Sequence, residues 1–126
     1  MVQDLTRYYF DQEEHVFDAS DDDHSNYIIG TASNPLGMQI KLYFKVEEGT
    51  IIDAKYNVNG CSILVAITAL YVEKVLGRNF ENCIDFKAFR IHEIINVPQN
   101  RMDRVLLLEN AVNACIEQKK HRLSVR

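Results

Sequence analysis

Cys61 is the residue of this sequence with the clearest capacity for chemistry, because of where the surrounding pattern places it. It follows Asn59-Gly60, where a predicted strand ends and a nearly all-apolar predicted helix begins. The first N–H groups of a helix have no intrahelical partner and the helix dipole stabilises negative charge there, so a thiol in the first turn has a lowered pKa. Gly60 permits a sharp turn or the close approach of another group. Cys61 could therefore be a metal or sulfur site, a reactive thiol, or a small buried side chain.

The other cysteines and the histidines do not complete a metal site. Cys115 falls on the apolar side of a predicted helix, Cys83 lies in a short mixed segment, and no histidine lies three or four residues after a cysteine. A soft-metal site usually needs three or four nitrogen or sulfur ligands. His92 is the one histidine in a segment that could fold back toward Cys61, although packing or surface placement is the commoner role. Three cysteines at wide spacing argue against a disulfide framework and indicate a reducing compartment, so we expect a cytoplasmic protein.

Length and composition are those of one globular domain. The chain has 126 residues, of which 47% are hydrophobic and 25% charged, and its formal net charge is -4. The negative balance argues against nucleic acid as the main partner. No apolar run approaches the length of a membrane span, and the N-terminus lacks the pattern of a secretory signal. GxSxG, P-loop and GxGxxG motifs are absent, and we predict that the chain is not an enzyme.

The elements that must position Cys61 begin with a hairpin. Alternation of apolar and polar residues predicts strands over 38–47 and 50–59, joined by a turn at Glu48-Gly49. We expect one face of this hairpin to be buried and the other to be solvated. The predicted buried face carries Met38, Ile40, Leu42, Phe44, Val46, Ile52, Ala54, Tyr56 and Val58.

Shorter elements are predicted before the hairpin. Residues 4–17 have loosely helical apolar spacing and predict an N-terminal helix. The acidic run 18–23 predicts a solvated loop. Residues 27–29 predict a short strand, and 31–37, with Pro and Gly, a loop.

Helices are predicted after the hairpin. Residues 61–76 are nearly all apolar and precede Gly77, a residue typical of the position just after a helix. Residues 80–95 predict one or two short helices, 97–100 a linker, and 101–120 a final helix. The side chains predicted to point inward from these later segments are Phe86, Phe89, Ile94, Val105, Leu108, Val112, Cys115 and Ile116.

Taken together, the elements predict an α+β domain in which helices pack on one face of a small antiparallel sheet. We predict a single domain over 1–126. Within it, 1–25 hold the N-terminal helix and acidic loop, 26–120 form the core, and 121–126 form a basic tail.

Four stretches of this sequence have a distinctive order and spacing. They are Gly37-x-x-x-Lys41-Leu42-x-x-Lys45-Val46, Gly49-x-Ile51-Ile52-Asp53-Ala54-Lys55-Tyr56-x-x-x-Gly60-Cys61, Val75-x-Gly77-Arg78-Asn79-Phe80 and Leu107-x-Glu109-Asn110-Ala111-Val112-x-Ala114-x-Ile116. With these stretches, residues 26–120 resemble the iron–sulfur cluster assembly scaffold family, the IscU-like domain also found as the N-terminal domain of NifU.

The resemblance implies a three-stranded antiparallel sheet with helices on one face. It also implies a role, because family members receive sulfur from a cysteine desulfurase, assemble a [2Fe–2S] cluster and hand it on. They hold the cluster with three cysteines and an aspartate or histidine, and in some members the same ligands hold one Zn²⁺. By resemblance, the cofactor would be iron, a [2Fe–2S] cluster or zinc, and the partners a cysteine desulfurase and other assembly proteins. The family's chaperone-recognition segment aligns with Val97-Pro98-Gln99-Asn100-Arg101.

The sequence departs from the family at the ligand positions. The family's A-x-C-G-D motif places Leu36 at the first cysteine and Met38 at the aspartate. Cys61 matches the second cysteine. The family's H-C-S motif places Asp103 at the histidine and Arg104 at the third cysteine. Two of the three cluster thiolates are therefore missing.

Cys61 and Asp103 are the remaining candidate metal ligands. Gly37 and Gly60 match glycines of the family's motifs, and the resemblance implies a structural role for both. A guanidinium at Arg104 would lower the pKa of Cys61 and could pair with Asp103. Cys61 and Asp103 alone are a poor ligand set for a cluster.

Three hypotheses follow. In the first, the protein acts in iron–sulfur assembly without holding a [2Fe–2S] cluster alone, and Cys61 carries a persulfide or shares a cluster with a partner. In the second, it is a degenerate paralogue that binds no cluster and acts as a partner-binding or regulatory protein. In the third, Cys61 is a redox or nucleophilic thiol on the same scaffold, which is less favoured because no base or second cysteine is predicted near it.

Overall fold

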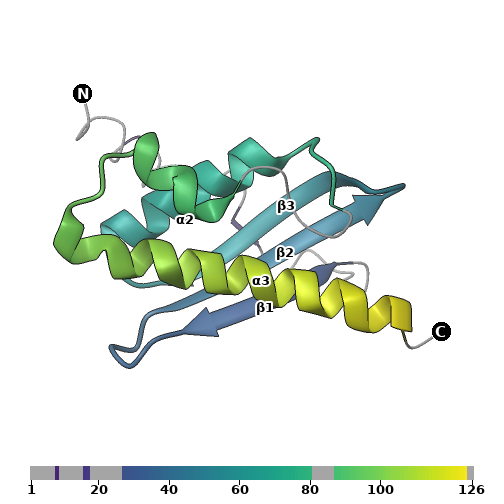
Figure 1. Cartoon of the computed structure of the whole chain (residues 1–126), viewed down its shortest axis with the longest axis horizontal. Helices are drawn as coiled ribbons and strands as arrows, with labels where there is room; N and C mark the ends of the chain where they lie inside the picture. Colours follow the sequence, from purple (N-terminus) through teal and green to yellow (C-terminus); the bar gives the residue numbers. More distant parts are fainter. Residues whose placement is uncertain (1–7, 9–15, 18–26, 81–86, 125–126) are drawn as a thin grey trace.

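Alternating apolar residues in the first half of the chain and apolar helical stretches in the second half produce a sheet covered by helices on one face (Figure 1). The computed structural model describes residues 8, 16–17, 27–80 and 87–124. The predicted α+β class, with three antiparallel strands and helices on one face, is confirmed. In chain order, the elements are β1 (Ile28–Ser33), β2 (Gln39–Glu47), β3 (Thr50–Asn59), α2 (Ser62–Val75), the 3₁₀ helices η2 (Ala88–Glu93) and η3 (Gln99–Arg101), and α3 (Met102–Ser124).

The hairpin of β2 and β3 forms the middle and one side of the sheet, whose strand order is β1-β2-β3. Its turn consists of Glu48 and Gly49, with φ angles of 52° and 79°. Two positive φ angles in a two-residue turn match the twist of the flanking strands, and glycine adopts such an angle without strain. The predicted hairpin and its turn are confirmed.

A β-bulge near this turn corrects the prediction for the start of β3. Lys45 pairs with Asp53, whereas Val46 pairs with Ile51, so Ile52 is an extra residue in β3. Ile51 is fully buried and Ile52 is 45% exposed. The prediction that Ile52 lies on the buried face is therefore wrong, because the extra residue reverses the alternation of faces before the bulge.

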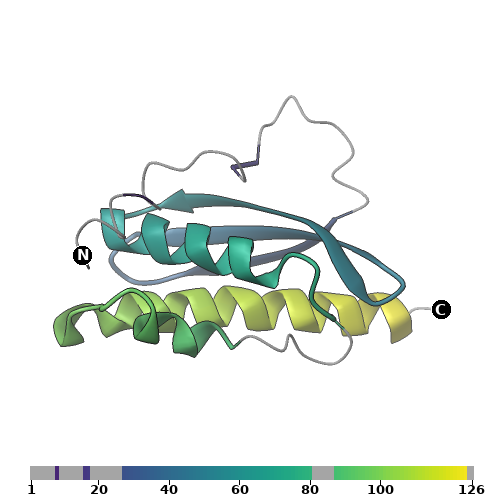
Figure 2. The same ribbon diagram turned by 90° about the horizontal axis from the view of Figure 1, so that it is seen from above.

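Two long helices cover one face of the sheet. Helix α3 packs on β1 and β2, α2 packs on β3, and the two helices contact each other. Figure 2 shows both helices on the same side of the sheet. Gly30 in β1 permits the close approach of α3, since a Cβ atom there would lie 2.5 Å from the Ala111 carbonyl oxygen and 2.5 Å from Cys115 Sγ. This contact fixes α3 against the sheet. The inward residues predicted for α3 are confirmed as buried at Val105, Leu108, Val112 and Cys115, and as partly buried at Ile116.

Helix α2 lies between β3 and α3, as its nearly all-apolar sequence predicts. It ends before Gly77, whose φ of 84° stops the helix, as predicted. The Gly77 N–H donates to the Ile51 carbonyl at 2.8 Å, and the Phe80 N–H donates to the Gly49 carbonyl at 2.7 Å. The end of α2 is thereby tied to the hairpin turn, so its start lies at the opposite end of the sheet.

The outer face of the sheet is less solvated than the alternation of residues predicts. Tyr43 is only 3% exposed, because Phe17 stacks on its ring with the centroids 4.0 Å apart. Tyr27 packs edge-on against both rings, and its hydroxyl donates to Asp53 Oδ2 at 2.6 Å. The Tyr43 hydroxyl donates to Asn57 Oδ1 at 2.9 Å. The prediction of a solvated face is thus wrong at Tyr43, where a small aromatic cluster covers the sheet.

The helix predicted over 4–17 lies mostly outside the described residues. Tyr8 is helical, but Val16 forms a parallel bridge with Tyr56, so the prediction is wrong at that end. The loop predicted over 18–23 lies outside the described residues.

Two element boundaries also differ from prediction. Strand β1 continues through Ser33, although the loop was predicted from Thr31, because its pairing with β2 continues to Gln39. Helix α3 continues to Ser124, beyond the predicted end at residue 120, because its last residues are mostly good helix formers. No helix in the described part of the chain is long and apolar enough to cross a membrane.

Residues 87–101, which lead into α3, form the 3₁₀ helix η2, an extended stretch and the 3₁₀ helix η3. Ile91 and Ile95 are buried, whereas Ile94 is 36% exposed, so the prediction that Ile94 points inward is wrong. These two isoleucines, four residues apart, face the core in its place. Phe86 and the side chain of Phe89 lie outside the described residues. Part of the predicted linker forms η3, which leads directly into α3.

Candidate functional site

The loop between β1 and β2 has a fixed shape because one side chain holds it. The Oδ1 atom of Asn34 accepts hydrogen bonds from the N–H groups of Leu36, at 3.0 Å, and Met38, at 3.1 Å. The Gly37 N–H donates to the Asn34 carbonyl at 3.0 Å, and Gly37 has a φ of 88°, which other residues adopt with strain. Gly37 therefore supplies a backbone conformation that this loop requires. Asn34 was not singled out from the sequence, although the Asn-Pro pair that it begins is a turn signal.

Gly60 brings this loop against the start of α2. A Cβ atom on Gly60 would lie 2.7 Å from Leu64 Cδ2 and 3.4 Å from Met38 Cγ. The glycine thus permits the close approach of the Leu64 side chain in α2 to the end of β3. Met38 and Cys61 are brought to the same end of the sheet as a result.

Cys61 is the N-cap residue of α2, with φ of −82° and ψ of 170°. It therefore stands one residue before the helix, and the prediction that it lies in the first turn is wrong by that one residue. Its side chain makes no cap hydrogen bond and is half-buried. Burial raises the pKa of Cys61, but the Arg104 side chain and the N–H groups of Leu64 and Ile63 outweigh burial and lower it overall.

Arg104, in the first turn of α3, is the counterpart of this thiol. It is only 8% exposed. Arginines are rarely buried to this extent unless they are paired. The Nη1 atom of Arg104 lies 2.6 Å from Asp103 Oδ1, and its guanidinium is near enough to the Cys61 thiol to lower the pKa of that thiol. Both neighbours raise the pKa of Arg104 above its ordinary value, and Cys61 has the larger effect. Its Nε atom is buried and makes no hydrogen bond to the described residues. Arg104 therefore places a permanent positive charge between Cys61 and Asp103.

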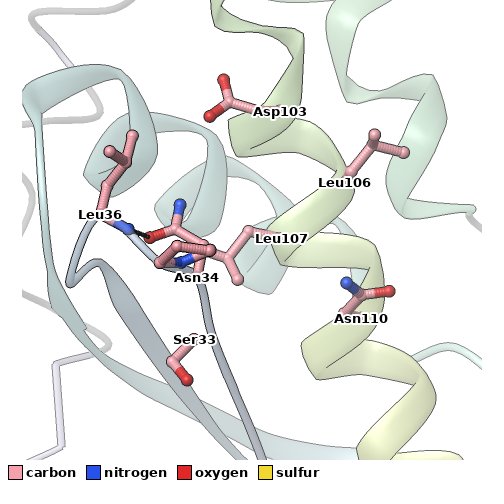
Figure 3. Close-up of a pocket in the computed structure, with 8 residues that line it drawn as sticks. Ser33, Asn34, Leu36, Asp103, Leu106, Leu107 and Asn110 are labelled. Atoms are coloured by element: carbon pink, nitrogen blue, oxygen red, sulfur yellow. Dashed lines mark hydrogen bonds between the residues drawn. The ribbon is translucent and has the colours of Figure 1, made fainter.

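An open groove of about 520 Å³ lies beside this network, between the β1–β2 loop and the start of α3. Figure 3 shows Leu36 on the loop side of the groove and Asp103, Leu106 and Asn110 on the side of α3. Leu36 is 70% exposed and Leu106, also on the groove, is 48% exposed. The groove was not predicted from the sequence, because its walls come from segments about 70 residues apart.

The five positions that the family resemblance assigns to cluster ligands meet at this end of the sheet. Leu36 shares the groove with Asp103, Met38 lies against Gly60 beside Cys61, and Arg104 contacts both Cys61 and Asp103. The sequence-predicted site is thus brought together in space. All five residues lie at the same end of the sheet, but their side chains differ chemically from the ligands of a cluster site.

These side chains do not fit a [2Fe–2S] cluster or a zinc ion. Leu36 has no donor atom, Met38 offers a weak thioether, and the Asp103 carboxylate is already paired with Arg104. Cys61 is the single thiolate, whereas cluster and structural zinc sites use three or four nitrogen or sulfur ligands. In the described part of the chain, no group of three His, Cys, Asp or Glu side chains could hold a metal ion.

The remaining candidates lie away from this network or outside the described residues. Cys115 is fully buried in the core, and burial raises the pKa of its thiol far above the usual range. The prediction of a packing role for Cys115 is confirmed. Cys83 lies outside the described residues. His92 lies in η2, half-buried.

Comparisons with known proteins agree with the fold. The family described as NifU-like N terminal domain matches residues 5–125. The chain is 31% identical over 106 residues to the iron–sulfur cluster assembly scaffold protein IscU of Azotobacter vinelandii, covering 83% of this chain and 81% of that protein. It is 29% identical over 107 residues to the IscU of Escherichia coli, covering 84% and 82% of the two chains.

Two solved structures have the same fold. A NifU-like N-terminal protein from Brucella abortus superposes with a TM-score of 0.68 at 18% identity, over 94% of this chain and 93% of that one. A putative scaffold protein for the SUF system from Fervidobacterium islandicum has a TM-score of 0.66 at 17% identity, over 89% and 93%. Since the family match spans nearly the whole sequence, the chain belongs to the NifU-like N-terminal domain family of iron–sulfur cluster assembly scaffolds.

Proposed function

We propose that this protein acts in iron–sulfur cluster assembly by accepting sulfur on Cys61, without holding a [2Fe–2S] cluster by itself. The observation that carries this proposal is the buried Arg104 side chain, whose charge lowers the pKa of a half-exposed thiol. A cation fixed beside the sulfur favours the thiolate, which is the nucleophilic form, and favours the anionic persulfide that it would become.

The transfer step requires no oxidant or reductant. The Cys61 thiolate attacks the terminal sulfur of a cysteine persulfide on a donor protein. A new sulfur–sulfur bond forms on Cys61 while the donor's sulfur–sulfur bond breaks, and its electron pair leaves with the donor's cysteine sulfur as a thiolate. The terminal proton is lost to solvent, and the Arg104 guanidinium stabilises the resulting charge.

The donor class proposed is a cysteine desulfurase, and other assembly proteins would then consume the sulfur. We expect these contacts to occur in the cytoplasm, with no role for nucleic acid or a membrane surface, and we expect no turnover by the protein itself. A cluster or metal would be held only jointly, because a partner would have to supply the ligands that Leu36 and Arg104 cannot.

A second candidate function is that of a partner-binding or regulatory paralogue. The exposed Leu36 and Leu106 favour it, because they add apolar surface to the groove beside Asp103. The two functions differ in whether they need the thiol. Sulfur acceptance is lost without Cys61, whereas partner binding through Leu36 and Leu106 persists.

Radiolabelled cysteine and a cysteine desulfurase distinguish the two functions. The desulfurase and this protein are incubated anaerobically and separated without reductant. We expect label on wild type and on the C115S variant, and none on C61S. A pull-down in parallel compares C61S with the double variant L36S/L106S. Loss of label only in C61S supports sulfur acceptance, whereas unlabelled wild-type protein that still binds the desulfurase supports the paralogue instead.

A further inference from the structure

The disagreement between the ligand positions and their residues centres on Arg104. In a cluster-binding or zinc-binding site, positive charge comes from the metal and the surrounding thiolates neutralise it. Here Arg104 comes from the protein and lies between a thiol and a carboxylate. We propose that the Arg104 guanidinium takes the place of the metal cation between Cys61 and Asp103, and thereby closes this site to zinc and iron when no partner supplies further ligands.

Both remaining donor groups are already engaged by Arg104. Asp103 Oδ1 lies 2.6 Å from Arg104 Nη1, and the same guanidinium acts on the Cys61 thiol and lowers its pKa. A metal ion would have to displace Arg104 from both groups before it could coordinate them. Arginine does not lose its proton in proteins, so it cannot yield the site by becoming neutral.

Burial prevents Arg104 from turning aside easily. Its side chain is 90% buried, and its Nε atom has no hydrogen-bond partner in the described part of the chain. An unpaired buried donor such as this Nε atom is unfavourable. Hydrogen bonding alone therefore does not account for an arginine at this position. A divalent ion next to this fixed guanidinium would also experience direct repulsion.

Metal exclusion and sulfur acceptance can fail separately. A protein that receives sulfur on Cys61 and also binds zinc would retain the proposed function and lose this inference. A protein that accepts no sulfur and binds no zinc would lose the proposed function and retain this inference.

The test uses two variants that each add one thiol to the site. L36C adds a thiol on the far side of the groove and keeps Arg104. R104C adds a thiol, removes the guanidinium and frees Asp103. All proteins carry C83S, so that Cys61 and the buried Cys115 are the only other cysteines. Zinc affinity is measured by competition with a chromogenic chelator, and cobalt binding by the sulfur-to-cobalt charge-transfer band.

We expect R104C to bind zinc at least ~100-fold more tightly than both L36C and the C83S parent, because only R104C combines a second thiolate with a released carboxylate. L36C binding zinc as tightly as R104C would overturn the proposal, as would tight zinc binding by the parent. Circular dichroism and thermal unfolding establish that each variant is folded.

A second pair keeps the test decisive if R104C does not fold. R104Q keeps a hydrogen-bonding side chain without charge, and R104K keeps the charge. We expect R104Q to bind cobalt roughly ten-fold more tightly than R104K. Equal cobalt affinities in this pair would show that the charge at position 104 does not exclude metal.

Discussion

Arg104, in the first turn of α3, lowers the pKa of Cys61, the N-cap residue of α2. The interaction links the starts of the two helices that cover the sheet. The same guanidinium lies 2.6 Å from Asp103, so Arg104 acts on two other family ligand positions at once. The reactivity of Cys61 therefore depends on a residue 43 positions away in the sequence.

The first prediction concerns the pH at which Cys61 reacts. Burial raises its pKa, but Arg104 and the helix N–H groups lower it below that of an ordinary thiol. Alkylation by iodoacetamide should therefore accelerate at a lower pH than for an unperturbed cysteine, and R104Q should move the midpoint upward. A lowered folded-state pKa also means that the thiolate stabilises the fold at alkaline pH, and that this contribution is lost as the pH falls through that pKa.

The control for this experiment is R101Q, which removes the charge of an exposed arginine three residues earlier. Its alkylation midpoint should equal that of wild type. If R104Q and R101Q had the same midpoint, Arg104 would have no influence on the thiol.

The second prediction concerns the selectivity of thiol labelling. Cys115 is fully buried and burial raises its pKa far above the usual range, so neither access nor ionisation favours its reaction. In a C83S background, Ellman's reagent should label one thiol in the native protein and both thiols in denaturant. Peptide mapping should find the native label on Cys61. Native labelling of Cys115 at a similar rate would contradict the packing described for α3.

The third prediction tests the bulge in β3 with two adjacent residues of the same type. I51A should lower the free energy of unfolding by about 3 kcal/mol, because Ile51 is fully buried. I52A should lower it by less than about 1 kcal/mol, because Ile52 is the extra, exposed residue. Urea unfolding measures both. The opposite order would mean that β3 has the register without the bulge.

The fourth prediction compares two glycines. G30A places a methyl group 2.5 Å from the Ala111 carbonyl oxygen and from Cys115 Sγ, so it should cost about 3 kcal/mol of stability. G37A meets nothing within 4 Å, and the positive φ of Gly37 should cost only about 1 kcal/mol. Chemical denaturation compares both variants with wild type. A G30A protein as stable as G37A would show that α3 does not press on β1 at this point.

Much of the fold follows from local patterns in the sequence. Alternation predicts the hairpin, and Gly49 and Gly77 mark the turn and the end of α2 correctly. The bulge at Ile52 is not predictable in this way, because Ile51 and Ile52 are the same residue type and either could face inward. The burial of Tyr43 is missed for another reason, since the ring that covers it belongs to Phe17, far away in the sequence.

The site is predictable in part. The family's motif spacing groups Leu36, Cys61 and Arg104, and in the structure these three residues lie at one end of the sheet. Motif spacing says nothing of how deeply Arg104 is buried or that it holds Asp103 and Cys61 at once. Those features depend on the packing of α2 beside α3, which local patterns do not describe.

The most direct test of the account is native mass spectrometry of the full chain after anaerobic incubation with a cysteine desulfurase, cysteine and ferrous iron. The account predicts the mass of one added sulfur atom, located on Cys61 by fragmentation, and no bound iron. A [2Fe–2S] cluster on ions that contain this chain alone, without the desulfurase, would contradict the account. A wild-type protein whose Cys61 gains no sulfur would also contradict it.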